Sequence, residues 1–302
     1  MKITTKIVLT LIALIVAISQ VSLAAAETPP ATMPAATQTA PVPKGLKVLT
    51  SGHSMHVWVG KWLRDVALSA GIKDHEFKAY WWSAPEVREA LKEGKMDVLT
   101  LAVYKSPDGI EKIAEMGLAA NPNLRVTIQE MWSPADGSWP GDPKNPWHTS
   151  IGDFDKMTID LLRKIHEPYI KKFDDAVEAA NKKLGKQVVF VVPVAQAVMA
   201  LREKIIAGQA PGIEKQSDLF ADGGGHPKPV LQALTAYCHY AVIYHRNPVG
   251  LPVLDEMKMP RVAEKDIAAL NRLLQEIAWD AVIHHPLSGV TGRSSDASET
   301  RP

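Results

Sequence analysis

Short apolar runs alternate with longer amphipathic segments along most of this chain. The runs of β-strand length cover residues 47–50, 76–82, 97–103, 125–131 and 187–194. The run at residues 97–103 is nearly continuous, which is typical of a central strand that is buried on both faces of a parallel sheet. The alternation therefore predicts an α/β protein: a three-layer α/β/α sandwich around a five-stranded parallel sheet in the order 2-1-3-4-5.

The segments between and after these runs have helical spacing. Helices are expected over residues 55–70, 84–93, 107–120, 154–184, 195–207, 230–245 and 263–284. Pro168 falls inside the fourth of these and predicts a kink or a break, because proline lacks the backbone N–H that the helix needs. A long loop rich in proline and tryptophan, residues 132–152, precedes that helix.

The two ends of the chain have a different composition from its middle. Residues 1–26 resemble a secretory signal, with Lys2 and Lys6 before an apolar run and three alanines at its end. Residues 27–44 are rich in Pro, Ala and Thr and are expected to form a disordered linker. Residues 45–290 then form one α/β domain, and residues 291–302 are a polar tail. This organisation predicts a secreted or periplasmic protein with no membrane span once the signal is removed.

Charge and cysteine content exclude several classes of function. The formal net charge is +1, with both signs interspersed, so no nucleic-acid-binding surface is expected. The single cysteine, Cys238, lies in an apolar helical segment and cannot form an intramolecular disulfide. We expect it to be a buried, unreactive thiol.

The first strand leads into a tight turn that contains a candidate nucleophile. Ser51-Gly52-His53 follows the strand, and Ser54 comes directly before the first expected helix. A turn at this place lies at the carboxyl ends of the strands, where open α/β sheets bind ligands. Ser54 could be a nucleophile if a histidine reaches it, or it could simply be the N-cap of the helix.

A second stretch supplies the histidine. Asp222 is followed by three glycines and then by His226, just before another helix. A histidine with a nearby carboxylate can act as general base for a serine, since the carboxylate fixes the tautomer and stabilises the imidazolium. The alternative is a glycine-rich surface turn that the aspartate helps to cap.

Together, Gly52-His53-Ser54 after the first strand and the late pair Asp222 and His226 resemble the SGNH (GDSL-like) hydrolase superfamily over residues 46–245. The resemblance implies a flavodoxin-like sheet, Ser54 as nucleophile, His226 as general base and Asp222 as its orienting partner. It also implies that the backbone N–H of Ser54 forms part of an oxyanion hole.

The chain departs from that family in three places. The aspartate lies four residues before the histidine, where the family has three. Residues 82–84 replace the family's oxyanion glycine after the second strand, and residues 103–106 replace its asparagine after the third. Asn145, in the long loop, is a candidate substitute for that asparagine.

Further side chains are expected at the same rim of the sheet. The candidates for oxyanion or substrate binding are His53, Met55, Trp82, Gln129, Trp132 and Asn145. Instead of lying at the rim, Gln129 could equally well be a strand residue whose side chain faces a helix. Five of the eight tryptophans gather here, which suits the flat faces of sugar rings or a small satellite core: Trp81, Trp82, Trp132, Trp139 and Trp147.

These observations predict an exported serine esterase that cleaves an ester, such as an acyl group on a carbohydrate. Its partner would be a small-molecule or glycan ester, and neither a cofactor nor a metal is expected. One alternative is a catalytically inactive saccharide-binding protein on the same fold, which the missing asparagine favours. A weaker alternative is a metal-dependent hydrolase that uses His53, His56 and His148.

Overall fold

A computed structural model describes residues 41–82, 84–103, 109–133, 136, 150–258 and 262–291. These residues contain a five-stranded sheet in the order β2-β1-β3-β4-β5, and every pairing is parallel. The strands are β1 (Lys47–Gly52), β2 (Glu76–Trp81), β3 (Val98–Leu101), β4 (Arg125–Gln129) and β5 (Val189–Val192). The predicted fold class and strand order are both confirmed.

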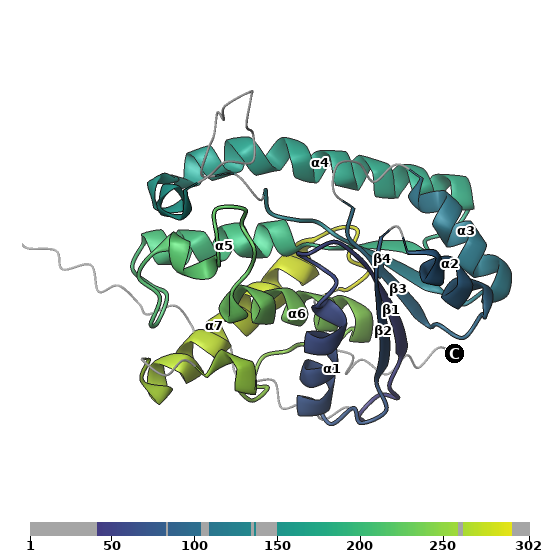
Figure 1. The fold of residues 1–302 in the computed structure, drawn as a ribbon, viewed down its shortest axis with the longest axis horizontal. Coiled ribbons are helices and arrows are strands. Elements are labelled where there is room, and N and C mark those ends of the chain that lie inside the picture. The colour runs from purple at the N-terminus through teal and green to yellow at the C-terminus, as the bar shows by residue number, and fades with distance from the viewer. Residues whose placement is uncertain are drawn as a thin grey trace, which may run out of the picture. The chain divides into compact units, whose positions relative to one another are not determined.

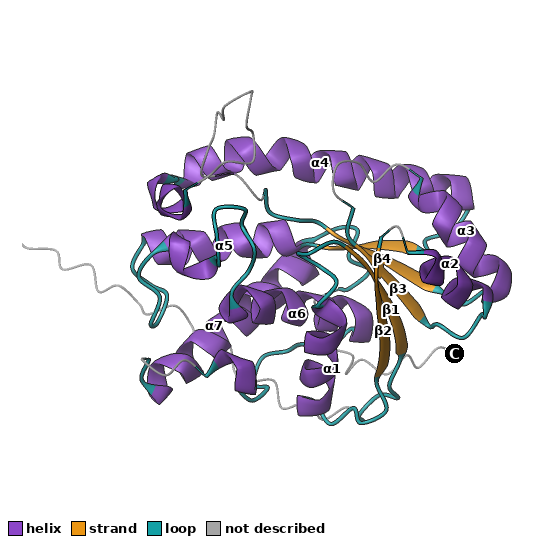
Figure 2. Cartoon of the chain, viewed as in Figure 1, coloured by secondary structure: helices purple, strands orange, loops and turns teal. Residues whose placement is uncertain are grey.

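The helices cover both faces of the sheet, as Figures 1 and 2 show. One core holds side chains from α1 (Val59–Ser69), α5 (Val194–Ile206), α6 (Pro229–Tyr244) and α7 (Glu264–His284). The core on the other face holds side chains from α2 (Pro85–Lys92), α3 (Ile110–Ala120) and α4 (Ile159–Leu184). Successive strand residues point to opposite faces, so β1, β3 and β5 contribute side chains to both cores.

Helix α6 is the most enclosed helix among the described residues. Residues Val230 to Tyr244 are nearly all apolar, and every one from Ala233 to Tyr244 is buried. A helix that is apolar all round is stable only inside a protein, and α6 packs against both α1 and α7. Cys238 lies here, fully buried, and burial raises the pKa of its thiol. The expectation of an unreactive thiol is consistent with this position.

Two helices differ from the sequence-based expectation. Helix α1 begins at Val59 rather than Met55, because residues 54–58 form consecutive turns closed by backbone bonds to the carbonyls of His53 and His56. Helix α4 begins at Ile159 and continues past Pro168 to Leu184, so of the kink or break expected there, the break does not occur. A 3-10 helix, η2 (Ile151–Lys156), occupies the start of the segment that was expected to be helical from residue 154.

The outer edge of the sheet at β5 is covered by the segment after α7. The Val191 N–H donates to the Leu287 carbonyl at 2.9 Å, and Gly289, with φ of 73°, lies against the Phe190 ring. A side chain at Gly289 would have its Cβ within 2.6 Å of that ring. An edge strand covered in this way is protected from pairing with another chain.

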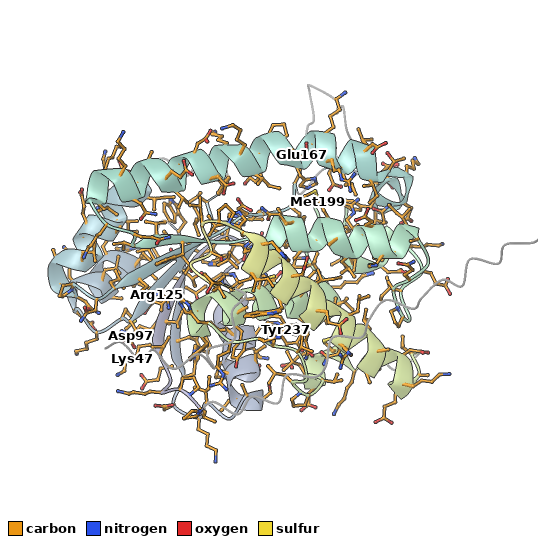
Figure 3. The ribbon with its side chains drawn as sticks, turned by 180° about the vertical axis from the view of Figure 1, so that it is seen from behind. Lys47, Asp97, Arg125, Glu167, Met199 and Tyr237 are labelled. Carbon is orange, nitrogen blue, oxygen red and sulfur yellow. The ribbon has the colours of Figure 1, made fainter. Side chains whose placement is uncertain are left out.

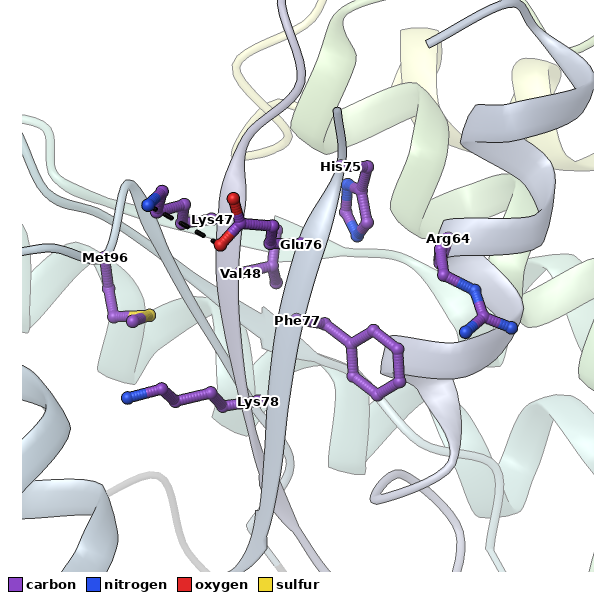
Figure 4. Close-up of a pocket in the computed structure, with 8 residues that line it drawn as sticks. All are labelled: Lys47, Val48, Arg64, His75, Glu76, Phe77, Lys78 and Met96. Carbon is purple, nitrogen blue, oxygen red and sulfur yellow. Dashed lines mark ion pairs between the residues drawn. The ribbon is translucent and has the colours of Figure 1, made fainter. Parts of the chain in front are cut away.

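Polar contacts stabilise the end of the sheet at which the strands begin. The Lys47 N–H donates to Asp97 at 2.7 Å, and the Arg125 guanidinium donates to the carbonyls of Val242 and Ile243 at the end of α6 (Figure 3). A hollow of about 360 Å³ opens nearby, beside the Lys47–Glu76 ion pair and the Phe77 ring (Figure 4). Because ligands of open α/β sheets bind at the opposite, carboxyl-terminal edge, we do not take this hollow as the active site.

Within the described residues, no helix is both long enough and apolar enough to cross a bilayer. The signal, the linker and all but the first residue of the polar tail predicted from the sequence lie outside the residues described, apart from residues 41–44. Those assignments remain predictions.

Candidate active site

The structure brings the three residues expected to carry catalysis into one hydrogen-bonded chain. The Ser54 Oγ lies 2.9 Å from His226 Nε2. On the other side of the ring, His226 Nδ1 lies 2.8 Å and 3.0 Å from the two carboxylate oxygens of Asp222. This is the connectivity by which a carboxylate orients a histidine that deprotonates a serine. Ser54 is exposed, and the His226 side chain is 42% exposed, so the group opens to solvent.

The glycine-rich loop explains how an aspartate four residues before the histidine still reaches it. Asp222 Oδ1 accepts hydrogen bonds from the backbone N–H of Gly224 at 2.9 Å and of His226 at 3.3 Å. Gly225 closes the turn with φ of 74°, a conformation that glycine adopts without steric cost. The extra residue is therefore absorbed in a tight turn around the carboxylate.

Electrostatics favour the charged form of Asp222. Partial burial raises the pKa of this carboxyl, but the hydrogen bonds from the His226 ring and from the His226 and Gly224 amides more than offset it. The net effect lowers its pKa below the ordinary value. Asp222 is thus an anion at neutral pH, as a group that stabilises an imidazolium must be.

Ser54 is held in a turn and does not cap α1. The capping residue of α1 is Trp58, four positions later, and the Trp58 indole N–H donates back to the Ser54 carbonyl at 3.1 Å. Gly52 makes the turn possible, since a Cβ there would lie 2.8 Å from His56 Cδ2. The N-cap interpretation of Ser54 is therefore wrong, and its side chain is left to face His226.

A buried polar cluster lies beneath this turn. His56 Nδ1 and His239 Nε2 each lie 2.9 Å from Gln129 Oε1, and the Gln129 amide N–H donates weakly to the Met55 carbonyl at 3.4 Å. Thr100 joins from β3, with its carbonyl 3.2 Å from His56 and its hydroxyl 3.3 Å from His239. All four side chains are fully buried, so the cluster links α6, β3 and β4 to the residues that flank Ser54.

Burial keeps the histidines of this region neutral. It lowers the pKa of His56 to about 4, although the hydrogen bonds to Gln129 and Thr100 act in the opposite direction. Burial, with a smaller contribution from the nearby His226, likewise lowers the pKa of His53 to about 4. His53 Nδ1 accepts from the Met55 N–H at 3.3 Å. These neutral rings add no fixed positive charge beside the Ser54–His226 pair.

The Trp132 side chain supports the loop that carries His226. It is fully buried, and its indole N–H donates to the Gly225 carbonyl at 3.0 Å. Gly225 directly precedes His226, so this bond fixes the backbone from which the imidazole projects. Trp132 thus has a supporting position, although the sequence suggested a substrate-contacting one.

Of the other residues expected at the site, some lie at the exposed rim of the sheet, some are buried beneath the turn, and some lie outside the described residues. Trp82 is 44% exposed and Trp81 56% exposed, and the Trp82 N–H donates to the Gly52 carbonyl at 2.9 Å, directly beside the nucleophile turn. Met55 and Gln129 are buried under the turn, which agrees with the alternative position that the sequence allowed for Gln129. Asn145, Trp139, Trp147 and residues 104–106 lie outside the described residues.

The contacts of His56 weaken the histidine-based metal alternative. Both ring nitrogens of His56 already face polar atoms of Gln129 and Thr100, and His53 Nδ1 accepts a backbone N–H. His148 is outside the described residues. Within the described ranges, the group with ligand atoms close enough for a metal lies elsewhere, at Glu130, Asp174 and His285.

Three supporting residues were not singled out from the sequence as part of the site. They are Trp58, His239 and Thr100, for which the sequence raised no functional expectation. His239 sits alone among apolar residues of α6, which is a weak sign of a buried partner. Its partner, Gln129, is 110 residues away, and no local pattern reveals such a pairing.

Comparison with known proteins supports the fold alone. The chain matches no protein-family model and no curated protein. It aligns with the crystal structure of a DUF4886 family protein from Bacteroides uniformis, with a TM-score of 0.51, over 82% of this chain and 98% of that chain, at 14% sequence identity. At this identity the likeness concerns architecture and carries no activity across. The described chain is thus an α/β protein similar in fold to that DUF4886 family protein.

Proposed function

We propose that this protein is an ester hydrolase of the SGNH type that uses Ser54, His226 and Asp222. The observation that carries the proposal is the continuous chain from the Ser54 hydroxyl through the imidazole to the Asp222 carboxylate. Two segments 172 residues apart supply this chain, and both lie where an α/β sheet binds its ligands.

The reaction would proceed through an acyl-enzyme. Ser54 Oγ attacks the ester carbonyl carbon while its proton passes to His226 Nε2. Asp222 stabilises the imidazolium that forms. His226 then returns the proton to the departing alkoxide, and a water molecule, deprotonated by the same ring, hydrolyses the acyl group from Ser54.

The oxyanion of the tetrahedral intermediate needs donors beside Ser54. The backbone N–H of Ser54 is the first candidate, as in the family that the motif resembles. Each donor of this kind typically contributes about 10²–10³ in rate. Because residues 82–84 and 103–106 stand where the family has its glycine and asparagine, we expect lower turnover than in a hydrolase with a complete set of donors.

The substrate class follows from the open rim. Trp81 and Trp82 are both largely exposed beside the nucleophile turn and offer flat apolar faces to a ring. An acylated carbohydrate places an ester oxygen next to such a ring, so an acyl sugar is the substrate we propose. An exported location, which the expected signal segment suggests, would give access to glycans outside the cytoplasm.

Hydrolysis of p-nitrophenyl acetate tests the proposal with Ser54→Ala and His226→Ala beside the native protein. Ser69→Ala is the matched control, because the Ser69 hydroxyl bonds only locally, to the Val66 carbonyl at 2.8 Å in α1. We expect turnover in the native protein and in the control, and at least a 10³-fold loss in the two site variants. Equal rates in Ser54→Ala and native protein would refute the serine mechanism.

The exposed tryptophans also favour a second candidate, a saccharide-binding protein without turnover. Quenching of tryptophan fluorescence by a glycan, with no hydrolysis of its acetylated form, would select that function. Loss of the quenching in Trp82→Ala would locate the binding at this rim.

A further inference from the structure

A second group of ionisable side chains lies on the other face of the sheet from the Gln129 cluster. Glu130 follows β4 and points away from its neighbour Gln129, because consecutive residues of a strand face opposite sides. There it meets Asp174 of α4 and His285, the residue after α7. His285 Nε2 lies 3.3 Å from Asp174 Oδ1 and 3.7 Å from Glu130 Oε1.

These carboxylates lack the hydrogen bonds that buried charges require. Glu130 is fully buried, and neither of its oxygens has a hydrogen-bond partner in the structure; the same is true of Asp174 Oδ1. Buried charged groups are normally paired, hydrogen-bonded or bound to a metal. The 3.7 Å contact of His285 with Glu130 is too long for a hydrogen bond, and the 3.3 Å contact with Asp174 lacks the alignment of one, so most of this acceptor capacity is unused.

The spacing of the three groups is that of ligands around one cation. All three ligand atoms lie within 4.8 Å of one another. Two ligands on a tetrahedral zinc ion with bonds of 2.0–2.2 Å are about 3.4 Å apart, close to the distances observed from His285. Imidazole nitrogen and carboxylate oxygen are both ligand types that zinc takes in proteins.

We propose that Glu130, Asp174 and His285 form a binding site for a divalent transition-metal ion such as Zn²⁺. The ion would join the end of β4, the middle of α4 and the segment that covers the edge of β5. Entry is from the α4 side, since the Asp174 side chain is 27% exposed while those of Glu130 and His285 are nearly inaccessible. Water would fill the remaining coordination.

Binding has one local cost. The Leu287 N–H donates to His285 Nδ1 at 3.2 Å, whereas a ring that binds metal through Nε2 carries its proton on Nδ1. The metal would therefore replace this weak hydrogen bond, which protonation of His285 also removes, with three ligand bonds. Without metal, burial raises the pKa of Glu130 to about 7 and works to lower that of His285, which the two carboxylates nevertheless raise to about 9. A protonated, metal-free ion triad is thus the competing arrangement.

Calorimetry with ZnCl₂ on the full chain, stripped with a chelator and dialysed, decides between them. Asp174→Asn is the test variant because its partly exposed position tolerates substitution best. His284→Ala is the matched control, since His284 is adjacent to His285 but exposed and paired with Asp280. A melting curve of each protein without metal verifies that it is folded.

We expect one saturable zinc site per chain, a rise in Tm of several degrees on adding equimolar zinc, and unchanged binding in His284→Ala. Asp174→Asn should weaken zinc binding at least tenfold. No saturable site in the native protein, or equal affinity in folded Asp174→Asn, would overturn the proposal in favour of the metal-free ion triad. Because the readout is binding, the result is independent of whether Ser54 is catalytic.

Discussion

Replacing Trp132 with phenylalanine tests whether the hydrogen bond from Trp132 to Gly225 positions His226. The substitution removes the buried indole N–H that donates to the Gly225 carbonyl at 3.0 Å, while it retains an aromatic ring in the core. A buried carbonyl left without its donor costs about 1–3 kcal/mol, and the smaller ring adds about 1 kcal/mol. We therefore expect a total of about 2–4 kcal/mol, which corresponds to a fall in Tm of roughly 4–16 °C for a domain of this size.

The effect on catalysis should exceed that of a general loss of stability. Gly225 precedes His226, so a shift of its carbonyl turns the imidazole away from Ser54. Displacements of about 1 Å at a reacting group can cost 10²-fold in rate, and we expect kcat/KM for the aryl ester to fall by about 10–100-fold.

Trp62→Phe is the matched control for this experiment. Trp62 is 5% exposed in α1 and belongs to the same core cluster, so it loses the same ring atoms. It should lower Tm with little change in kcat/KM, assayed well below the melting temperature of each variant. Equal kcat/KM in the two variants, measured on fully folded protein, would refute the positioning role of Trp132.

Three further predictions concern stability and binding. Burial depresses the pKa of His56 to about 4, so the unfolded state binds more protons below pH 6.5. Urea denaturation should therefore show that this histidine lowers the stability by about 2 kcal/mol from pH 7 to pH 5. Arg202→Ala should lower the free energy of unfolding by about 3–5 kcal/mol in the same assay, because it leaves the fully buried Asp136 carboxylate without its ion-pair partner. Breaking the exposed Arg163–Glu203 pair should cost under about 1 kcal/mol. Trp82→Ala should raise KM for an aryl or sugar ester several-fold and leave Tm nearly unchanged, since the side chain is 44% exposed; an unchanged KM would remove Trp82 from the substrate surface.

The architecture was accessible from the sequence because it depends on local patterns. Apolar runs such as the one that contains β3 are too short for helices and too continuous for half-exposed strands, and the segments between them have helical spacing. Together these features lead to a parallel sheet in the observed order. The start of α1 was misplaced because residues 54–58 make turns whose bonds mimic a first helical turn. The break expected at Pro168 is absent because a long helix packed along the sheet tolerates one missing hydrogen bond.

The sequence predicts site residues only where a reactive residue type lies beside residues typical of a tight turn. Ser54 after a glycine turn, and His226 after an aspartate and three glycines, stand out because few other roles need that combination. The supporting contacts do not stand out, because they join residues such as Gln129 and His239 that become neighbours only when α6 packs on the sheet. Glu130 shows the same limitation: it is a polar residue near the end of the fourth strand, and only its packing against α4 shows it to be buried.

The reactivity of Ser54 is the most direct test of the proposed mechanism. The native protein would be treated with a fluorophosphonate, which forms a stable adduct only on an activated serine, and digested for mass spectrometry. We expect one adduct, on the peptide that contains Ser54, and its loss in folded His226→Ala. Absence of the adduct from Ser54 in the native protein, or equal labelling in His226→Ala, would contradict a serine activated by this histidine.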